Sequence, residues 1–183
     1  MNQYFRDFHN NWIAKANAIS TNELSDIFDK YITLFVIYNN LYNQVPNKLI
    51  ISGIPVPNKI FDNKAATELV VKFLTPEDLL LEFSNNNLDN DIESIINLID
   101  QETFHIKINY GGYNRNEDLK ILNELKSENK GKKATGILKV IYYVRCNIFH
   151  GNKDFVEYQR ILMEPLIKIL SVTNDFLFRK LTE

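Results

Sequence analysis

The sequence has few of the residues that build covalently or metal-stapled folds. Cys146 is the only cysteine among 183 residues, which excludes an intramolecular disulfide and any zinc site made of several cysteines. With so little cysteine, the reducing cytoplasm is the expected compartment. Glycine (6 residues) and proline (5 residues) are scarce as well, so collagen-like and low-complexity classes are excluded.

Long apolar runs and a strong net charge are also missing. The longest apolar runs, such as residues 31–38, are far too short to span a bilayer, so no membrane partner is expected. The first residues lack a basic segment followed by an apolar one, and no signal peptide is predicted. A net charge of −2 with 45% hydrophobic and 24% charged residues is typical of a globular protein. The length predicts a single domain over residues 1–183.

Apolar residues recur at steps of three and four through most of the chain, which predicts an all-α, up-and-down helical bundle. Two regions depart from this pattern. Residues 45–63 hold three prolines and are predicted to be an irregular insert after the second helix. Residues 103–110 alternate apolar and polar side chains and are predicted to be extended, ending at Gly111 and Gly112, so that 103–112 is a possible extended segment. The expected helices cover about 5–18, 20–43, 64–74, 76–83, 92–100, 117–126, 134–149 and 154–179.

Local signals predict where several helices begin. Residues 20–23 have the spacing of a capping box, which places the start of the second helix there. Thr75 followed by Pro76 is typical of an N-cap with proline in the first turn. Asp89 or Asp91 is expected to cap the helix that follows.

Motifs of the common enzyme classes are absent. The chain has no glycine-rich phosphate loop, no His-Glu-x-x-His zinc motif and no Gly-x-Ser-x-Gly elbow. His9 and His105 lie far from the third histidine in sequence and are predicted to be surface or strand-face residues. We therefore expect no metal site and no cofactor.

Basic residues are concentrated late in the chain. Residues 126–153 hold seven basic residues and one acidic residue, a local charge of +6, whereas the remainder carries −8. Such a patch is suited to a polyanion, and a solvated helix face balanced by acidic neighbours is the alternative. The lysines expected to contact RNA are Lys130, Lys132, Lys133 and Lys139.

The sharpest feature is Arg145 and His150, five residues apart at the end of a predicted helix. Arginine grips a phosphate with two parallel hydrogen bonds, and histidine moves a proton near neutral pH, so the pair fits metal-free phosphodiester cleavage. On an ideal helix the two side chains lie about 140° apart. They meet on one chain only if the helix unwinds near Phe149 or the arginine curls round. The alternative is an arginine paired with an acidic neighbour and a histidine that caps a helix, with Gly151 as the left-handed cap residue.

The string YYVRCNIFHGNKDF at 142–155 resembles the motif region of HEPN domains, whose signature is an arginine followed four to six residues later by a histidine. The string FDKYITLFVIYNNLYN at 28–43 resembles the early HEPN helix that ends in an aromatic–Asn–aromatic pattern. The resemblance is firm over 145–153, moderate over 28–43 and architectural elsewhere. Many members carry a polar residue directly after the arginine, whereas here that position is Cys146 and Asn147 follows it.

The resemblance implies a dimeric helical bundle. Many family members are metal-independent RNases that act as toxins or antiviral effectors, with arginine and histidine contributed across a homodimer interface. For this chain it implies that Arg145 and His150 are catalytic, with RNA as the substrate and a nucleotidyltransferase-type antitoxin as a possible partner. The residues expected to support the site are Asn147, which orients the histidine or a phosphate oxygen, and Lys153, which adds positive field. Tyr38 and Asn39, together with Tyr42, are expected either to line the cleft or to pack in the core with one satisfied asparagine.

Two other functions remain open on the sequence. Some HEPN domains have lost catalysis, so a silent module that binds a partner protein or nucleic acid is the main alternative. A plain helical interaction domain without a site is the third, and it predicts that Arg145 and His150 point away from any shared cleft.

Overall fold

The computed structural model describes residues 3–109, 112–151 and 156–183. Their architecture is an all-α helical bundle, as the sequence predicts. In chain order the elements are α1 (Gln3–Ala18), α2 (Leu24–Tyr42), α3 (Val45–Ile51), α4 (Asp62–Lys64), a π-helical turn (Ala65–Leu69), α5 (Val70–Leu74), α6 (Pro76–Asn85), α7 (Asp89–Asp100), β1 (Ile108–Asn109), β2 (Gly112–Tyr113), α8 (Arg115–Leu125), α9 (Lys130–Phe149), a 3₁₀ turn (Glu157–Gln159) and α10 (Arg160–Thr182).

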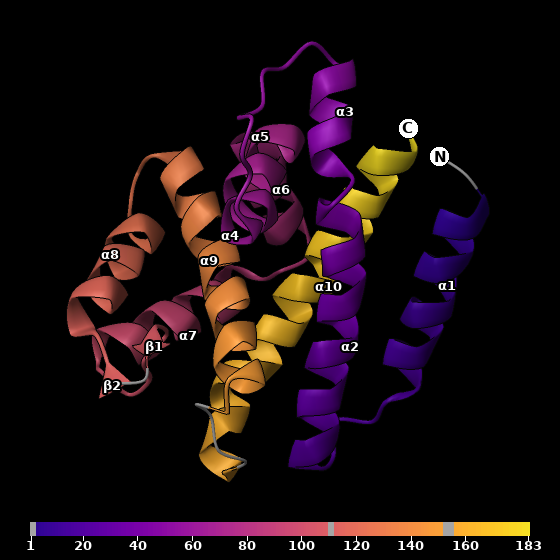
Figure 1. The fold of residues 1–183 in the computed structure, drawn as a ribbon. Coiled ribbons are helices and arrows are strands. Elements are labelled where there is room, and N and C mark those ends of the chain that lie inside the picture. Colours follow the sequence, from indigo (N-terminus) through magenta and orange to yellow (C-terminus); the bar gives the residue numbers. More distant parts are fainter. Residues whose placement is uncertain (1–2, 110–111, 152–155) are drawn as a thin grey trace.

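Four long helices form the frame of the molecule. Figure 1 shows α1 running antiparallel to α2, and α9 antiparallel to α10, with α2 and α10 packed together. Buried side chains tie these helices to one another. The Tyr31 hydroxyl of α2 donates to the Ile141 carbonyl of α9 at 2.6 Å, and the Asn174 amide of α10 donates to the Leu34 carbonyl of α2 at 2.9 Å. The frame therefore fixes α9, which carries the motif residues, against α2.

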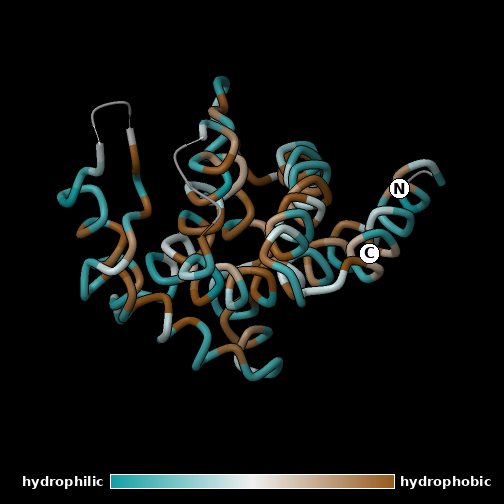
Figure 2. The backbone as a smooth tube through the Cα atoms, turned by 90° about the horizontal axis from the view of Figure 1, so that it is seen from below, coloured by the Kyte–Doolittle hydropathy of each residue, from teal (hydrophilic) through white to brown (hydrophobic). Residues whose placement is uncertain are grey.

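The core follows from the apolar stripes of these helices. Apolar stretches lie mainly inside the bundle and polar stretches at its periphery (Figure 2). On α9, Ile137, Ile141 and Val144 are buried and Ile148 packs partly against the core, so apolar residues at steps of three and four line the face of this helix that meets the core. Burying such side chains removes apolar surface from water, the main favourable contribution to folding.

The insert predicted at 45–63 is not wholly irregular, because its first seven residues form α3. Pro46 was expected to stop the preceding helix, and α2 does end at Tyr42, but Pro46 then lies in the first turn of α3. Proline fits there because the first-turn amides have no helical acceptor. Residues 53–61 that follow contain neither helix nor strand.

Helix starts agree with the sequence in one case and differ in two. The Thr75 hydroxyl accepts a hydrogen bond from the Asp78 amide at 3.2 Å, as its N-cap prediction requires. The capping box at 20–23 does not form, because Ser20 Oγ instead accepts the Asn22 amide at 3.1 Å and α2 begins at Leu24. Leu88, and not an aspartate, holds the N-cap position of α7.

The extended segment is much shorter than predicted, because β1 and β2 pair through only two residues each. Gly112 belongs to β2 and does not end the segment, while Gly111 lies outside the described residues.

The fully buried carboxylate of Asp118 on α8 accepts hydrogen bonds from the amides of Ile106 and Lys107, both at 3.0 Å. These amides are satisfied by a side chain, so no neighbouring strand is needed.

Two histidines differ from their predicted surface positions. His105 is half-buried, with Nδ1 3.0 Å from Asp118 Oδ2 and its ring stacked on Tyr113. His9 is only 6% exposed and stacks on Phe178 of α10 with 3.6 Å between ring centroids. Burial lowers the pKa of His9 to about 4, because the charged imidazolium is poorly solvated there. A histidine on an amphipathic helix therefore serves as a core residue here.

The last helix is continuous. Its predicted start at Asp154 lies outside the described residues, and α10 begins at Arg160 after the 3₁₀ turn. Pro165 lies within α10 and does not split it. Among the helices of the described ranges, none combines the length and the apolar character needed to cross a membrane.

Candidate functional site

Arg145 and His150 lie at the C-terminal end of α9, where the helix stays regular to Phe149. His150 is the C-cap, and its amide donates to the Cys146 carbonyl at 3.0 Å. Gly151 follows with φ +67° and donates to the Ile148 carbonyl at 3.1 Å, so the left-handed cap is as predicted. Because the helix does not unwind at Phe149, the two motif side chains leave it in directions about 140° apart.

Two aromatic rings hold the Arg145 guanidinium. Its Cζ lies 5.1 Å from the ring centroid of Phe35 on α2 and 4.7 Å from that of Phe149 on α9. Its Nε is buried and has no hydrogen-bond partner among the described residues, and Nη1 lies 3.8 Å from the Cys146 sulfur. No carboxylate among the described residues forms an ion pair with it. The cation is thus oriented by the two rings, and no carboxylate of the described chain lies within ion-pair distance of it.

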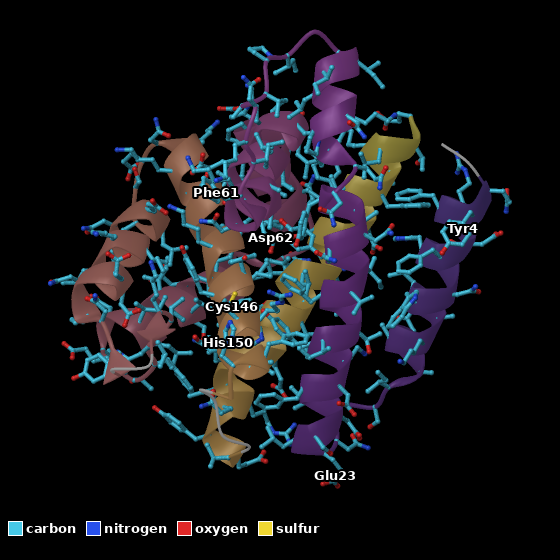
Figure 3. All side chains as sticks on the ribbon, viewed as in Figure 1. Tyr4, Glu23, Phe61, Asp62, Cys146 and His150 are labelled. Carbon is cyan, nitrogen blue, oxygen red and sulfur yellow. The ribbon has the colours of Figure 1, made fainter. Side chains whose placement is uncertain are left out.

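His150 is exposed at the same end of α9. In Figure 3 it lies beside Cys146 on the near side of the helix, as residues four apart must. Within the ranges that the structure covers, its ring makes no hydrogen bond and no ion pair. An exposed imidazole without an assigned partner is able to exchange protons with a bound ligand.

A carboxylate clamped by two phenols lies beside this arginine. The Tyr42 hydroxyl donates to Asp62 Oδ1 at 2.7 Å, and the Tyr142 hydroxyl donates to Asp62 Oδ2 at 2.9 Å. The Tyr42 hydroxyl also contacts Asn39 Oδ1. Burial raises the pKa of both phenols, Asp62 raises it further, and the charge of Arg145 lowers it. Both tyrosines are therefore protonated donors at neutral pH.

Neither Asp62 nor Tyr142 was predicted from the sequence to be a site residue. Tyr142 begins the string that contains Arg145, but it lies 80 residues from Asp62 in the chain, and Asp62 belongs to no motif. The aromatic pair at 142–143 next to Arg145 was visible in the sequence, but its partner was not. The π-helical turn that follows α4 packs against both α2 and α9, and this tertiary contact brings the carboxylate to the two phenols.

Two of the predicted supporting residues serve the core. Asn147 is 3% exposed, and its amide donates to the Ile106 carbonyl at 2.8 Å, so it anchors the segment before β1 and does not orient His150. Tyr38 is fully buried, and its hydroxyl donates to the Ala66 carbonyl in the π-helical turn, so it does not line a cleft. Asn39 is half-buried and joins the tyrosine cluster through Tyr42, whereas Lys153 lies outside the described residues.

The predicted RNA-binding lysines lie toward the other end of α9. The helix has 20 residues and is therefore about 30 Å long, so Lys130 lies roughly that far from His150. Lys130 and Lys133 line one cavity of about 460 Å³, whereas Lys132 and Lys139 line another of about 420 Å³. Lys139 pairs with Glu124 at 2.6 Å. Within one chain, the structure does not bring these lysines to the Arg145 end.

The described part of the chain contains no group of three or more His, Cys, Asp or Glu side chains placed to hold a metal ion. Comparison with family models, with curated proteins and with solved structures gives no match to this chain. The class that the fold defines is thus an all-α helical bundle, and the function has to be argued from the site.

Proposed function

We propose that this protein is a metal-independent endoribonuclease of the HEPN type that cleaves RNA by attack of a ribose 2′-hydroxyl. The observation that carries the proposal is the state of Arg145, a cation oriented by Phe35 and Phe149 and without an ion-pair partner in the described chain. Arg145 holds the scissile phosphate and stabilises its developing charge. His150 is the general base or acid. The products are a 2′,3′-cyclic phosphate and a 5′-hydroxyl.

The proposed active site is shared by two copies of the chain. Cleavage requires one base and one acid, and the motif supplies one histidine per chain. Arg145 and His150 leave a regular helix about 140° apart, which separates their side chains on one copy. A twofold axis near His150 brings two arginines and two histidines to one cleft. Exposed Phe149, next to His150, supplies apolar surface for such an interface.

The biological setting follows from the same resemblance. We place the protein in the cytoplasm as a toxin or an antiviral-defence effector, with a nucleotidyltransferase-type antitoxin as a possible partner. A toxic ribonuclease has to be inhibited in the cell until its activity is needed. The search for that partner is guided by the surface around Arg145 and His150, because an inhibitor that covers this surface blocks the substrate.

The second candidate is a catalytically inactive module that binds a partner protein or nucleic acid. The observation that favours it is Asn147, whose side chain is buried and bonded to the Ile106 carbonyl. The motif therefore offers the substrate one polar side chain fewer than expected. This candidate predicts binding without cleavage.

The deciding experiment is an RNA cleavage assay in EDTA, with wild type, Arg145→Ala and His150→Ala. The proposal expects cleavage by wild type, cyclic-phosphate ends and loss of cleavage in both variants. Lys15→Ala is the matched control, since this exposed cation lies on α1, which carries no motif residue. Cleavage that survives both motif substitutions contradicts the proposed site. A folded, dimeric wild type that binds RNA and never cleaves it favours the inactive module.

A further inference from the structure

We propose that the phenols of Tyr42 and Tyr142 form an anion-binding subsite beside Arg145, which receives a phosphate of the bound strand and which Asp62 fills in the free protein. The subsite rests on the proposed ribonuclease function for the identity of its ligand. Asp62 lies at the end of the insert and acts as an internal competitor of the substrate.

The geometry of the clamp fits one small anion. Each oxygen of the Asp62 carboxylate accepts one phenol, at 2.7 and 2.9 Å, and the two phenols come from α2 and α9. A phosphate group likewise presents two charged oxygens to two donors, and hydrogen bonds to charged acceptors are stronger than those between neutral groups. The two tyrosines are thus already arranged to bind an anion, and the carboxylate shows where it sits.

Arg145 borders this clamp on α9. Tyr142 lies three residues before Arg145, so the two side chains are neighbours on the helix surface. Phe35 contacts both, with 6.4 Å between its ring centroid and that of Tyr142 and 5.1 Å to the arginine Cζ. The charge of Arg145 lowers the pKa of both tyrosines, which is the sign expected of a cation close to the two hydroxyls. One strand can therefore place neighbouring phosphate oxygens on the guanidinium and on the phenols.

The clamp can open at low cost. Asp62 is exposed, so its carboxylate is rehydrated as it leaves. The Tyr42 hydroxyl has a second acceptor in Asn39 Oδ1, and Tyr142 is partly exposed to water. Neither phenol is left buried without a partner, which is the situation that makes polar groups costly to release. Asp62 is the first residue of α4, directly after the irregular segment at 53–61, so rotation of its side chain takes the carboxylate out of the clamp without breaking a helical hydrogen bond.

Asp62 and a phosphate cannot occupy the subsite together, since both are anions. At about 4 Å in water, repulsion between two unit charges weakens binding roughly fivefold. Removal of the Asp62 charge should therefore strengthen RNA binding by about that factor. The insert then has a defined role, because it sets the affinity of the site for its substrate.

The test measures binding of a fluorescent 2′-O-methyl oligonucleotide, which lacks the attacking hydroxyl and is not cleaved. Asp62→Asn is expected to bind it about fivefold more tightly than wild type at the same salt concentration. Tyr142→Phe, added to Asp62→Asn, is expected to remove most of that gain. Asp62→Ser serves as a second variant, so that a folding defect of one substitution does not decide the result.

Two matched controls accompany these variants. Glu23→Gln removes one negative charge at the far end of α2, at the lower edge of Figure 3. Tyr143→Phe removes a phenol from the neighbouring position, whose ring contacts that of Tyr142 with 5.7 Å between centroids. The phenols that bond Asp62 are those of Tyr42 and Tyr142, so this control keeps the ring contact and leaves both clamp hydroxyls in place. Both are expected to bind within twofold of wild type. Unchanged or weaker binding by both Asp62 variants overturns the proposal, as does an equal loss with Tyr143→Phe and Tyr142→Phe.

Parallel cleavage assays separate this inference from the ribonuclease function. Tighter binding by Asp62→Asn, with no cleavage by any variant, supports the subsite and overturns the ribonuclease. Cleavage by wild type, with no effect of Asp62 substitutions on oligonucleotide binding, overturns the subsite and supports the ribonuclease.

Discussion

Both ends of α9 carry cations, but they hold them differently. At the middle of the helix Lys139 pairs with Glu124, and at the N-terminal end exposed Lys130 and Lys132 make no cation–π contact with an aromatic ring of the described chain. At the C-terminal end, Arg145 is stacked between Phe35 and Phe149. A mobile lysine loses conformational entropy when it binds, whereas a stacked guanidinium has already lost it. A cluster of basic residues in the sequence therefore indicates a surface that attracts anions. Tertiary packing determines which of these cations is held in place to bind a phosphate.

The largest expected difference between the two ends concerns catalysis. Arg145→Lys keeps the charge but removes the planar fork and the stacking, and we expect kcat/KM for RNA to fall at least 100-fold. Lys133→Arg, at the other end, should stay within threefold of wild type. Steady-state cleavage of a fluorogenic RNA measures both. Near-normal cleavage by Arg145→Lys would show that only charge matters and would remove the distinction between the ends.

The stability of the folded protein should decrease in acid because of His9, which is buried between α1 and α10. Its pKa is about 4 in the folded protein and about 6.5 when unfolded, so below pH 6.5 the unfolded chain binds a proton that the folded chain does not. The free energy of unfolding should fall by about 2–3 kcal/mol between pH 6.5 and pH 4.

Urea titrations across this pH range measure the effect. His9→Phe keeps an aromatic ring against Phe178 and should flatten the profile. A wild-type stability that does not change between pH 6.5 and pH 4 would contradict the burial of His9.

The two ends should also differ in their contribution to stability. Asn147→Ala removes the hydrogen bond to the Ile106 carbonyl and leaves that carbonyl buried without its partner, which should cost about 1–2 kcal/mol. Lys130→Ala, on an exposed side chain, should change the free energy of unfolding by less than about 0.5 kcal/mol. Urea denaturation at pH 7.5 compares them. Equal effects would mean that Asn147 is not a structural anchor.

Local patterns in the sequence were sufficient for much of the fold. The stripe on α9, the Thr75 cap and the left-handed Gly151 each depend on residues within one or two turns, so one sequence window contains the information. Residues 45–51 were predicted to be irregular partly because of Pro46, but proline fits the first turn of a helix as well as the segment after one. The capping box predicted at 20–23 does not form, because the Ser20 hydroxyl accepts a hydrogen bond within a turn.

The candidate site was only partly accessible to such patterns. Arg145 and His150 were found because the motif is contiguous. The partners of Asn147 and Tyr38 lie 41 and 28 residues away, and they assign both side chains to the core. A polar or aromatic residue beside a motif can serve either a cleft or the core, and only tertiary contacts distinguish the two. Asp62 could not be predicted for the same reason, because its hydrogen-bond partner Tyr142 lies 80 residues away in the sequence.

The smallest expected effect, that of the lysines, tests how the two ends relate in a dimer. Lys132→Ala and Lys133→Ala should each weaken RNA binding about two- to threefold and lower the salt dependence by less than about one phosphate contact. A much larger loss of cleavage would place these lysines at the active site.

In one chain these lysines and His150 lie near opposite ends of α9, which is about 30 Å long. Such a result would therefore require an antiparallel partner helix that sets the lysine end of one copy against the arginine end of the other. A small effect agrees with a twofold axis near His150, so salt-dependent binding of these two variants distinguishes the two dimer geometries.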